Sequence, residues 1–263
     1  MLDNITPVIL TFNEEANIER TLERLEWARE IVIVDSFSTD ATVSIVSRNR
    51  RVRLFQRAFD SHAQQWNFAI DATNITTDWF LALDADYVLP DGVIAELAAL
   101  QSEPGVNGYS AGFRYCIAGA PLRGTLYPDV TILCRRGFAH YEQEGHTQRV
   151  AVTGVVRRLT AKVLHDDRKP LAHWIASQQR YARLEAEYIL AGSAVGFDFV
   201  DRIRRWGWLA PVLVFFYTLV VKGCILDGRR GLFYVLQRTF AEVLIALEVI
   251  ERRLTGTGQF EGA

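Results

Sequence analysis

The sequence predicts an α/β fold, in which a mostly parallel sheet is flanked by helices and followed by a helical C-terminal extension. Three observations predict it. Short apolar runs alternate with helical patterns in the first hundred residues, as in βαβ units. From residue 108, strand-like pieces follow one another with Gly-containing turns between them, and from residue 171 the pattern is helical. We therefore expect a core at 1–170, with halves at 1–105 and 106–170, and an extension at 171–263.

The first half of the core carries the alternating pattern. Ile18, Leu22 and Leu25 lie at helical spacing. Residues 31–34 are four successive β-branched residues, which is typical of a strand buried in a parallel sheet. The expected strands are 8–11, 31–34, 52–55 and 79–83, and the expected helices are 14–29, 38–47, 63–72 and 93–101.

The second half of the core is expected to contain strands at 109–115, 130–134 and 150–156, and the extension to begin with a polar helix at 171–190. Residues 206–221 then contain no charged side chain, although they include Pro211, and Lys222 ends the run. The run is slightly shorter than the roughly 20 residues of a spanning helix. We therefore expect an insertion at a membrane interface, against the alternatives of a buried helical pair and a dimer interface.

The residues around this run support the same expectation. The next stretch has an apolar face and a polar face. The apolar face comprises Leu232, Val235, Leu236, Phe240, Val243, Leu244, Leu247 and Ile250, and the polar face Arg238, Glu242, Glu248 and Glu251. Cations that anionic headgroups attract flank the run at Arg202, Arg204, Arg205, Lys222, Arg229 and Arg230. We expect residues 202–250 to bind a membrane surface, on the cytoplasmic side of the inner membrane, as a peripheral or monotopic protein.

Composition narrows the class of protein. The 263 residues are 49% hydrophobic, which is too apolar for a disordered chain. The formal net charge of −2 offers no basic footprint, so we expect no nucleic-acid partner. Cys116, Cys134 and Cys224 are widely spaced without a Cys-x-x-Cys motif, which favours a reducing compartment. The N-terminus lacks a basic region followed by a long apolar run, so we expect the core to stay in the cytoplasm.

Polar residues follow three of the expected strands at their carboxyl ends, where open parallel sheets bind ligands. The first strand leads into Thr-Phe-Asn-Glu-Glu at 11–15, the second into Asp-Ser-Phe-Ser-Thr-Asp at 35–40, and the fourth into Asp-Ala-Asp at 84–86. Carboxylates of the third motif can share a Mg²⁺ or Mn²⁺ ion. Each motif is weak alone, because an Asp at a strand end is often a helix N-cap. Their order on successive strands indicates a nucleotide site with a metal.

These motifs carry a resemblance to a known family. Val-Ile-Leu-Thr-Phe-Asn-Glu-Glu at 8–15, Ile-Val-Asp-Ser at 33–36 with Thr-Asp at 39–40, and Leu-Ala-Leu-Asp-Ala-Asp at 81–86 resemble family 2 glycosyltransferases. Within that family the chain is most similar to bacterial lipopolysaccharide-core and exopolysaccharide enzymes of the WaaE/KdtX kind. The resemblance covers roughly residues 5–100 and is looser over 108–167.

The resemblance implies a GT-A fold, with 1–105 as the nucleotide-sugar half and 106–170 as the acceptor half. It also implies an inverting mechanism, a divalent metal (Mg²⁺ or Mn²⁺) and a donor such as a UDP-sugar. The apolar extension suggests a lipid-linked or cell-surface glycan as the acceptor.

Matched motif by motif, the resemblance also assigns residues to the donor and the metal. The nucleoside would be surrounded by Thr11, Asn13, Glu15, Asp35 and Asp40. Asp84 would touch the ribose or the metal, and Asp86 would bind the metal. Gln65 lies in Gln-Trp-Asn at 65–67, where similar enzymes often have a basic middle residue. Trp66 in that place is expected to pack in the core, with stacking on a donor ring as the alternative.

Later segments supply candidates for the chemistry itself. Inversion needs a base opposite the leaving diphosphate. Glu144 is the preferred base because similar enzymes place a carboxylate near this point, and His146 is the alternative; a polar surface loop is the plainer interpretation of the segment. His165 resembles the late histidine of many GT-A metal sites. Arg168, or the neighbouring Lys169, is a candidate to neutralise the departing diphosphate, against a simple charge cluster before a helix.

Other functions fit parts of the sequence. Asp84 and Asp86 after an apolar strand also match the nucleophile loop of haloacid-dehalogenase phosphatases, in which Asp84 would attack phosphorus. That class usually begins its fold with this strand, whereas three strands precede it here. A nucleotidyltransferase would need a Gly-rich basic loop at 11–15, which is acidic instead. A non-catalytic membrane-bound scaffold is disfavoured by the intact Asp35, Asp84 and Asp86.

Overall fold

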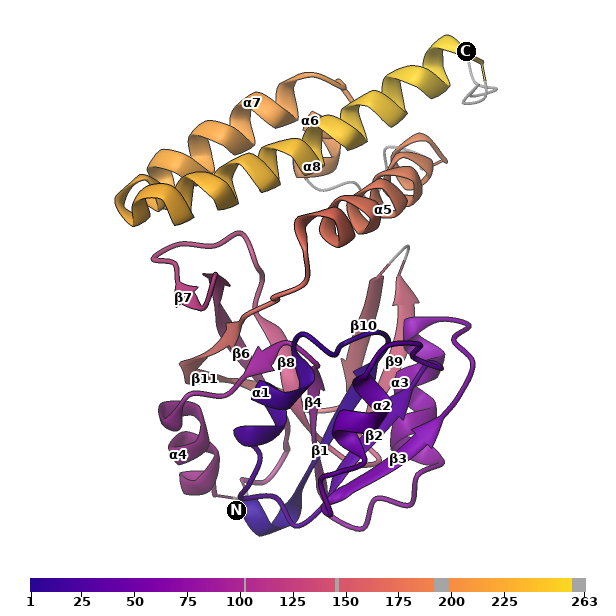
Figure 1. Cartoon of the computed structure of the whole chain (residues 1–263), viewed down its shortest axis with the longest axis vertical. Helices are drawn as coiled ribbons and strands as arrows, with labels where there is room; N and C mark the ends of the chain where they lie inside the picture. Colours follow the sequence, from indigo (N-terminus) through magenta and orange to yellow (C-terminus); the bar gives the residue numbers. More distant parts are fainter. Residues whose placement is uncertain (102, 145–146, 192–198, 257–263) are drawn as a thin grey trace. The chain divides into compact units, whose positions relative to one another are not determined.

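The structure, a computed structural model, describes residues 1–101, 103–144, 147–191 and 199–256 (Figure 1). The chain divides into two compact units. The first comprises Met1–Pro121 and Tyr127–Lys169, and the second comprises Leu122–Leu126 and Pro170–Ala263. A five-residue segment from the middle of the sequence therefore belongs to the C-terminal unit.

The first unit is built on a mixed sheet with the strand order β3-β2-β1-β4-β8-β6-β11-β5, and a short β7 pairs with β6. Its first four members are all parallel: β1 (Ile5–Thr11), β2 (Ile31–Asp35), β3 (Val52–Gln56) and β4 (Trp79–Asp84). This block confirms the βαβ part of the sequence prediction. Every residue of β2 is buried, as expected for a strand that is covered on both faces.

The remaining strands extend this block with mostly antiparallel pairings. They are β5 (Tyr87–Val88), β6 (Val106–Ile117), β7 (Ala120–Pro121), β8 (Val130–Arg135) and β11 (Val155–His165). β8 runs antiparallel to both β4 and β6, β11 is parallel to β6, and β5 is antiparallel to β11. A separate hairpin joins β9 (Ala139–Glu144) and β10 (Thr147–Val152).

Some expected elements have different bounds. The strand expected at 150–156 is two strands, β10 and β11, because Gly154 has a φ of 114° and breaks the extended path between them. The helices expected at 14–29 and 38–47 shorten to α1 (Ile18–Glu23) and α2 (Thr42–Val46). Their first turns are lost because the backbone at 13–15 and 38–41 forms hydrogen bonds between the two loops.

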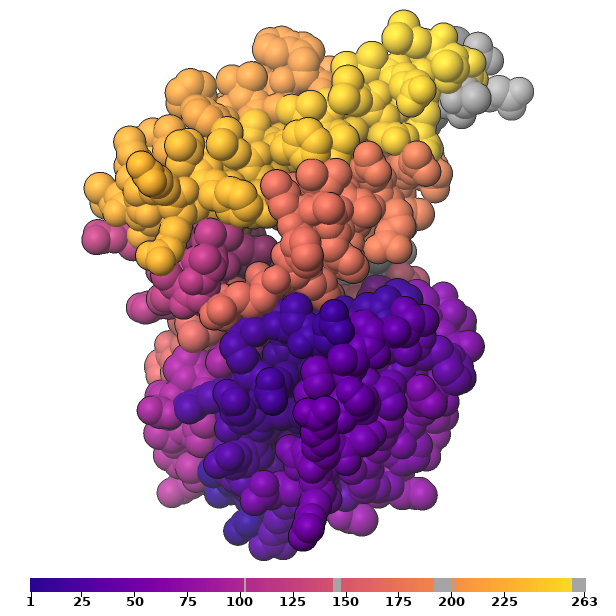
Figure 2. Space-filling view, viewed as in Figure 1, coloured from indigo at the N-terminus to yellow at the C-terminus, as the bar shows by residue number. Residues whose placement is uncertain are grey.

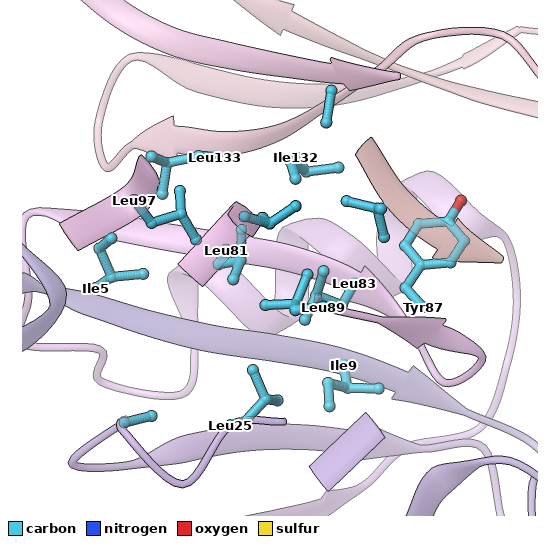
Figure 3. Packing of buried hydrophobic residues seen from close by; sticks show 14 of the residues in the cluster. Ile5, Ile9, Leu25, Leu81, Leu83, Tyr87, Leu89, Leu97, Ile132 and Leu133 are labelled. Carbon is cyan, nitrogen blue, oxygen red and sulfur yellow. The ribbon is translucent and has the colours of Figure 1, made fainter. Parts of the chain in front are cut away.

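Apolar side chains pack on both faces of the sheet because residues alternate along each strand. On one face Ile5, Ile9, Leu81 and Leu83 pack with α1 and with α4 (Asp91–Ala99), as Figure 3 shows for part of this cluster. On the other face Val8, Val32 and Phe80 pack against α3 (His62–Asp71). Burying each such side chain contributes about 1.5–3 kcal/mol. The strand ends that carry the polar motifs therefore rest on a rigid base.

The second unit is helical, which confirms that expectation. It contains α5 (Leu171–Ala191), α6 (Phe199–Arg204), α7 (Leu209–Phe216), a π-helical turn η2 (Tyr217–Val221), a 3-10 turn η3 (Cys224–Asp227) and α8 (Gly228–Leu254). α7 and α8 lie side by side, and their side chains fill the space between the ribbons (Figures 1 and 2). The segment between α6 and α7 lies beside the last turns of α8, since Arg253 Nη2 donates to Arg205 O.

The segment Leu122–Leu126 is held by the helices of this unit. Arg123 N donates to Asp227 Oδ2 over 3.0 Å, and Leu126 N donates to the Tyr234 hydroxyl over 2.9 Å. Gly124 fits against the chain at Lys222 so closely that a Cβ atom there would lie 2.0 Å from the Lys222 carbonyl oxygen. Only glycine is tolerated at this approach.

Charged residues in this unit depart from the expected faces. Arg204, expected among the cations that meet headgroups, forms ion pairs with Glu185 and Glu242, and Glu242, expected on the polar face of α8, is buried with it. Val235, expected on the exposed apolar face, is fully buried. A buried guanidinium requires carboxylate partners. Because Glu242 pairs with Arg204 inside the unit, α8 does not divide simply into one apolar and one polar face.

Among the described residues, no single helix has the length and apolar character needed to cross a membrane. Leu209–Val221 and Cys224–Leu254 together meet the length and composition criteria, with a bend of 68° at the break between them.

Candidate active site

The polar ends of β1, β2 and β4 meet at one edge of the sheet. Thr11 pairs with Asp35 across β1 and β2, and Leu10 pairs with Asp84 across β1 and β4. Thr11 Oγ1 donates to Asp35 Oδ1 over 2.9 Å. Because neighbouring parallel strands end at the same edge, the three motifs found in the sequence form one constellation.

Asp35 is completely buried and holds the loop that follows β2. Its Oδ2 accepts from the Ser38 backbone N–H over 2.8 Å, and its Oδ1 accepts from the Ser38 and Thr11 hydroxyls. A buried carboxylate is tolerated when its oxygens are hydrogen-bonded in this way. The predicted contact of Asp35 with the nucleoside would therefore add to a structural role.

Asn13 joins the loop after β1 to the loop after β2. Its backbone has a φ of 54°, in the left-handed region that Asn tolerates better than most residues. Asn13 Oδ1 accepts from Thr39 N over 2.8 Å, and Asn13 N donates to Ser38 Oγ over 2.9 Å. The two loops therefore form one connected surface at the end of the sheet.

Glu15 and Asp40 make a second set of links between these loops. Glu15 Oε2 accepts from Ala41 N over 2.9 Å, and Asp40 Oδ2 accepts from Glu15 N over 3.1 Å. Burial acts to raise the pKa of Asp40, but the hydrogen bonds from Thr42 and from the Glu15 backbone hold it below its ordinary value. The sequence-predicted donor residues 11, 13, 15, 35 and 40 are thus all brought together.

Gln65 lies behind this surface on α3 and is buried. Its Nε2 donates to Ser36 Oγ over 3.0 Å and to the Arg57 carbonyl over 3.2 Å, and its Oε1 accepts from Arg57 Nη1. These bonds make Gln65 a support of the loop after β2. Trp66 is buried and stacked on Tyr141, with ring centroids 5.2 Å apart, which confirms core packing.

Asp86 and His165 meet because β5 pairs with β11, which sets Tyr87 opposite His165. His165 Nε2 lies 2.9 Å from Asp86 Oδ2, and both side chains are largely shielded from solvent. Asp84 ends β4 two residues before Asp86. The fold therefore brings together the three residues that the sequence analysis assigned to a metal.

The three groups influence one another's protonation. Burial, followed by the negative charge of Asp86, raises the pKa of Asp84 to about 6. Burial also acts to raise the pKa of Asp86, but the charge and hydrogen bond of His165 hold it below its ordinary value. Burial acts to lower the pKa of His165, and Asp86 raises it above its ordinary value instead. A bound cation would oppose both effects on Asp84 and favour its ionised form.

By chemical type, carboxylate oxygens and an imidazole are ligands that a divalent cation can accept. His165 Nδ1 is buried without a hydrogen-bond partner, so the ring is not held by a second contact on that side. Within the described part of the chain, no three His, Cys, Asp or Glu side chains are arranged to hold a metal ion. A cation at this place would replace the direct contact between Asp86 and His165.

Aromatic rings enclose His165, a feature that the sequence analysis missed. The ring centroids of Tyr87, Tyr115 and Tyr127 lie 5.5, 4.7 and 4.6 Å from that of His165. The Tyr87 hydroxyl contacts the Tyr127 hydroxyl over 2.5 Å and also bonds with Asp84. No local sequence signal marks this enclosure, because the pairing of β5 with β11 brings Tyr87 to His165.

A second buried ion pair lies beside these carboxylates. Lys169 Nζ contacts Glu14 Oε1, and Asn17 Nδ2 donates to Glu14 Oε2 over 2.9 Å and to Asp167 Oδ1 over 2.8 Å. Burial raises the pKa of Glu14 to about 7, although the Lys169 charge opposes the shift. Lys169 therefore already has a carboxylate partner.

Arg168 has a protein partner as well. Its Nη2 donates to Asp166 Oδ2 over 2.7 Å, and its backbone N donates to Asn17 Oδ1 over 2.8 Å. The guanidinium lies so close to Gly119 that a Cβ atom there would be 2.4 Å from Nη2. A contact with a diphosphate would require Arg168 to share or leave Asp166.

The candidate bases are only partly described. Glu144 is the last residue of β9 and pairs with Thr147 of β10 through the backbone. His146 lies outside the described residues. The structure therefore places the β9–β10 hairpin but does not choose between the two.

Residues 6–151, more than half of the chain, match the family described as "Glycosyl transferase family 2". The chain is 28% identical over 197 residues to a Rhizobium meliloti (strain 1021) protein named "Lipopolysaccharide core biosynthesis glycosyltransferase LpsC", covering 70% of each sequence. It is 32% identical over 108 residues to an "Uncharacterized glycosyltransferase" of Rickettsia bellii (strain RML369-C), covering 41% of this chain and 36% of that protein.

Two solved structures are also similar. One is S. aureus TarS 1–349 in complex with UDP-GlcNAc, at 14% identity and a TM-score of 0.49, covering 98% of this chain and 93% of that one. The other is Mycobacterium tuberculosis glucosyl-3-phosphoglycerate synthase in complex with Mn²⁺, UDP and glucosyl-3-phosphoglycerate. It has 17% identity and a TM-score of 0.43, and the match covers 68% of this chain and 78% of that one.

Proposed function

Because the chain belongs to glycosyl transferase family 2, we propose that it moves a sugar from a UDP-sugar to a lipid-linked or cell-surface polysaccharide acceptor, with inversion at the anomeric carbon. One observation carries the proposal: Asp86 and His165 are in contact beside Asp84, at the sheet edge where Thr11 and Asp35 also end. This edge is where an open α/β sheet binds a nucleotide.

The connected loops at 11–15 and 35–40 hold the nucleoside in this proposal. Asn13 and Asp40 lie on the outer side of these two loops. Asp35 and Gln65 support the loops from the interior of the protein. Asp84, Asp86 and His165 would hold a Mg²⁺ or Mn²⁺ ion, which would supply positive charge to neutralise the diphosphate. Arg168 would contact the leaving group either while it stays paired with Asp166 or after it leaves that partner.

Inversion requires one base that removes a proton from the acceptor hydroxyl on the face opposite the diphosphate. Glu144, the last residue of β9, and His146, which lies outside the described residues, remain the two candidates. Parallel Glu144→Gln and His146→Gln variants assign the role. The variant that lacks the true base should lose kcat with little change in the KM for the nucleotide-sugar. The other variant should keep its kcat.

The acceptor and location are supported by different observations. The Rhizobium relative carries a name that places it in lipopolysaccharide core biosynthesis. The helical unit exposes apolar side chains to its surroundings. We therefore propose a glycan on a lipid as the acceptor and the cytoplasmic side of the inner membrane as the location, with the protein attached peripherally or monotopically.

Two other functions from the sequence analysis gain no support. In a haloacid-dehalogenase phosphatase Asp84 would be the nucleophile on the leading strand, whereas β4 here follows three parallel strands. A non-catalytic scaffold has no need to keep Asp86 and His165 paired at 2.9 Å.

The experiment is a donor panel on the full-length protein. Hydrolysis and transfer are measured with UDP-, GDP- and CMP-sugars, with Mn²⁺ or Mg²⁺, and the Asp86→Asn variant is compared with Asp71→Asn, an exposed carboxyl on α3. We expect turnover with a UDP-sugar that depends on the metal and is lost only in Asp86→Asn. Equal metal-dependent turnover in both variants contradicts the proposed site.

A further inference from the structure

The helical unit buries some of its charged side chains and exposes many of its large apolar ones. Glu185 and Glu242 are 8% and 4% exposed, whereas Trp206, Phe216 and Val221 are 68%, 59% and 69% exposed. In a unit surrounded by water the opposite distribution is expected, because apolar burial drives folding and charges favour solvent. This distribution indicates an apolar environment around part of the unit.

The two buried carboxylates, Glu185 and Glu242, both pair with the guanidinium of Arg204. Arg204 Nη1 donates to Glu185 Oε1 over 2.7 Å, and its Nε and Nη2 donate to the two oxygens of Glu242 over 2.9 and 2.6 Å. This arrangement ties α5, α6 and α8 together. Charged groups that lie next to lipid are paired and turned inward in this manner.

The apolar surface forms a regular stripe on α7 and η2. Its exposed members Val212, Leu213, Phe216, Tyr217 and Val220 are spaced by one and three residues, which places them on one side of a helix. Further exposed apolar residues lie on α8 at 232, 233, 236, 240, 247, 250 and 254. Large apolar side chains exposed in such number on neighbouring helices indicate an interaction site.

The residues around this stripe include several cations and few carboxylates. The sequence from 205 to 241 contains five cations and one carboxylate, Asp227, which pairs with Arg123. Arg229 and Arg230 are exposed at the start of α8, and Lys222 lies 5.5 Å from the Tyr217 ring at the end of the stripe. Trp206 and Trp208 stand at its other end, and indole rings are enriched at membrane interfaces.

We propose that this surface, the α7–η2 stripe with Arg229 and Arg230, binds an anionic phospholipid bilayer and lies along its surface. The stripe enters the boundary between headgroups and acyl chains, and the cations contact lipid phosphates. A second copy of this chain fits less well. A two-fold interface sets the same patch against itself, and here that would oppose cation to cation. The inference rests on the proposed function and deepens it by naming the surface that would attach the protein to the membrane of a lipid-linked acceptor.

The test is co-sedimentation of the full-length protein with vesicles of neutral phosphatidylcholine, or of phosphatidylcholine with 30 mol% phosphatidylglycerol (about one lipid in three, enough for a negative surface potential). No donor or metal is present, so the outcome is independent of sugar transfer. We expect binding to the anionic vesicles that exceeds binding to the neutral ones and declines with salt.

Matched variants identify the surface. Val220→Glu should weaken binding by about tenfold or more, whereas Val155→Glu, at an exposed valine of β11, should not. Arg229→Glu with Arg230→Glu should weaken binding by about 30-fold, whereas Arg48→Glu with Arg50→Glu should not. Circular dichroism confirms that each variant is folded.

Equal binding to neutral and anionic vesicles, or equal binding by Val220→Glu, overturns the proposal. Dimerisation in solution that Val220→Glu abolishes, without vesicle binding by the wild type, overturns it in favour of self-association. Vesicle binding by a protein that fails to turn over any donor leaves this inference intact and counts against the proposed function alone.

Discussion

His165 Nε2 and Asp86 Oδ2 lie 2.9 Å apart although 79 residues separate them in the chain. The contact is produced by a strand of only two residues, β5, which pairs with the end of β11. Tyr87, the residue after Asp86, is therefore fixed against β11. This pairing brings the His165 imidazole into contact with the Asp86 carboxylate. This contact is the point at which the proposed metal chemistry can be tested.

The first prediction concerns His165. His165→Asn removes the imidazole but keeps a polar side chain, and we expect the half-saturating Mn²⁺ concentration for donor turnover to rise by about tenfold or more. The donor concentration is kept saturating. His173→Asn, at an exposed histidine of α5, is the control. An unchanged Mn²⁺ requirement would show that His165 is not part of the metal site.

The second prediction concerns the pH dependence of stability. The folded pKa of Glu14 is about 7, above its ordinary value of 4.5, because the carboxyl is buried. The folded state thus holds this proton more tightly than the unfolded state, so stability present below pH 4.5 is lost as pH rises toward 7, with a slope of up to about 1.4 kcal/mol per pH unit. Glu14→Gln should flatten this part of the profile.

Urea unfolding of wild type and Glu14→Gln at pH 5 and pH 8 measures the difference. The wild type should lose more unfolding free energy between the two pH values than Glu14→Gln does. Glu23→Gln, at an exposed carboxyl of α1, should follow the wild type. Parallel profiles for wild type and Glu14→Gln would rule out the raised pKa.

The third prediction concerns the support beneath the donor loops. Asp35→Asn replaces a carboxylate that accepts from Thr11 and Ser38 with an amide that has only one acceptor oxygen. We expect a loss of about 1–3 kcal/mol of unfolding free energy, because a buried hydrogen-bond donor is left unpaired. The affinity for the nucleotide-sugar should fall as well. Asp71→Asn, at the surface, is the control for chemical denaturation and calorimetry.

The fourth prediction concerns the interior of the helical unit. Arg204→Met leaves Glu185 and Glu242 buried without their cation, and we expect a cost of about 3–5 kcal/mol. Replacing all three residues by Met and Leu should restore most of that stability. Thermal unfolding of both variants decides the point. A single variant as stable as the wild type would mean that the carboxylates do not depend on Arg204.

The parallel block of the sheet was predictable because its signals are local. Runs such as 31–34 are β-branched throughout, and strand ends at Thr11 and Asp84 are marked by an abrupt change to polar residues. The resemblance assigned His165 to a metal site, and the fold brings His165 into contact with Asp86. Helix bounds failed at 14 and 38, because backbone groups that would begin a helix bond across to the neighbouring loop instead.

The rest depends on contacts between distant parts of the chain. Nothing near Tyr87 reveals that its ring will pack on His165, since the β5–β11 pairing decides it. Hydrophobic periodicity assumes that charged residues face outward, so Arg204 and Glu242 were assigned to the surface. Such a pattern cannot distinguish a solvated face from an internal ion pair, because both place a charge at the same helical position.

The clamp on Leu122–Leu126 has a consequence for the order in which the protein is made. Arg123 and Leu126 leave the ribosome about a hundred residues ahead of Asp227 and Tyr234, their partners. Domains generally fold in the order of synthesis. This segment, which links β7 to Tyr127, therefore waits for the last helices. The clamp therefore closes only after η3 and the start of α8 have been synthesised, whereas the strands of the first unit up to β7 are made before it.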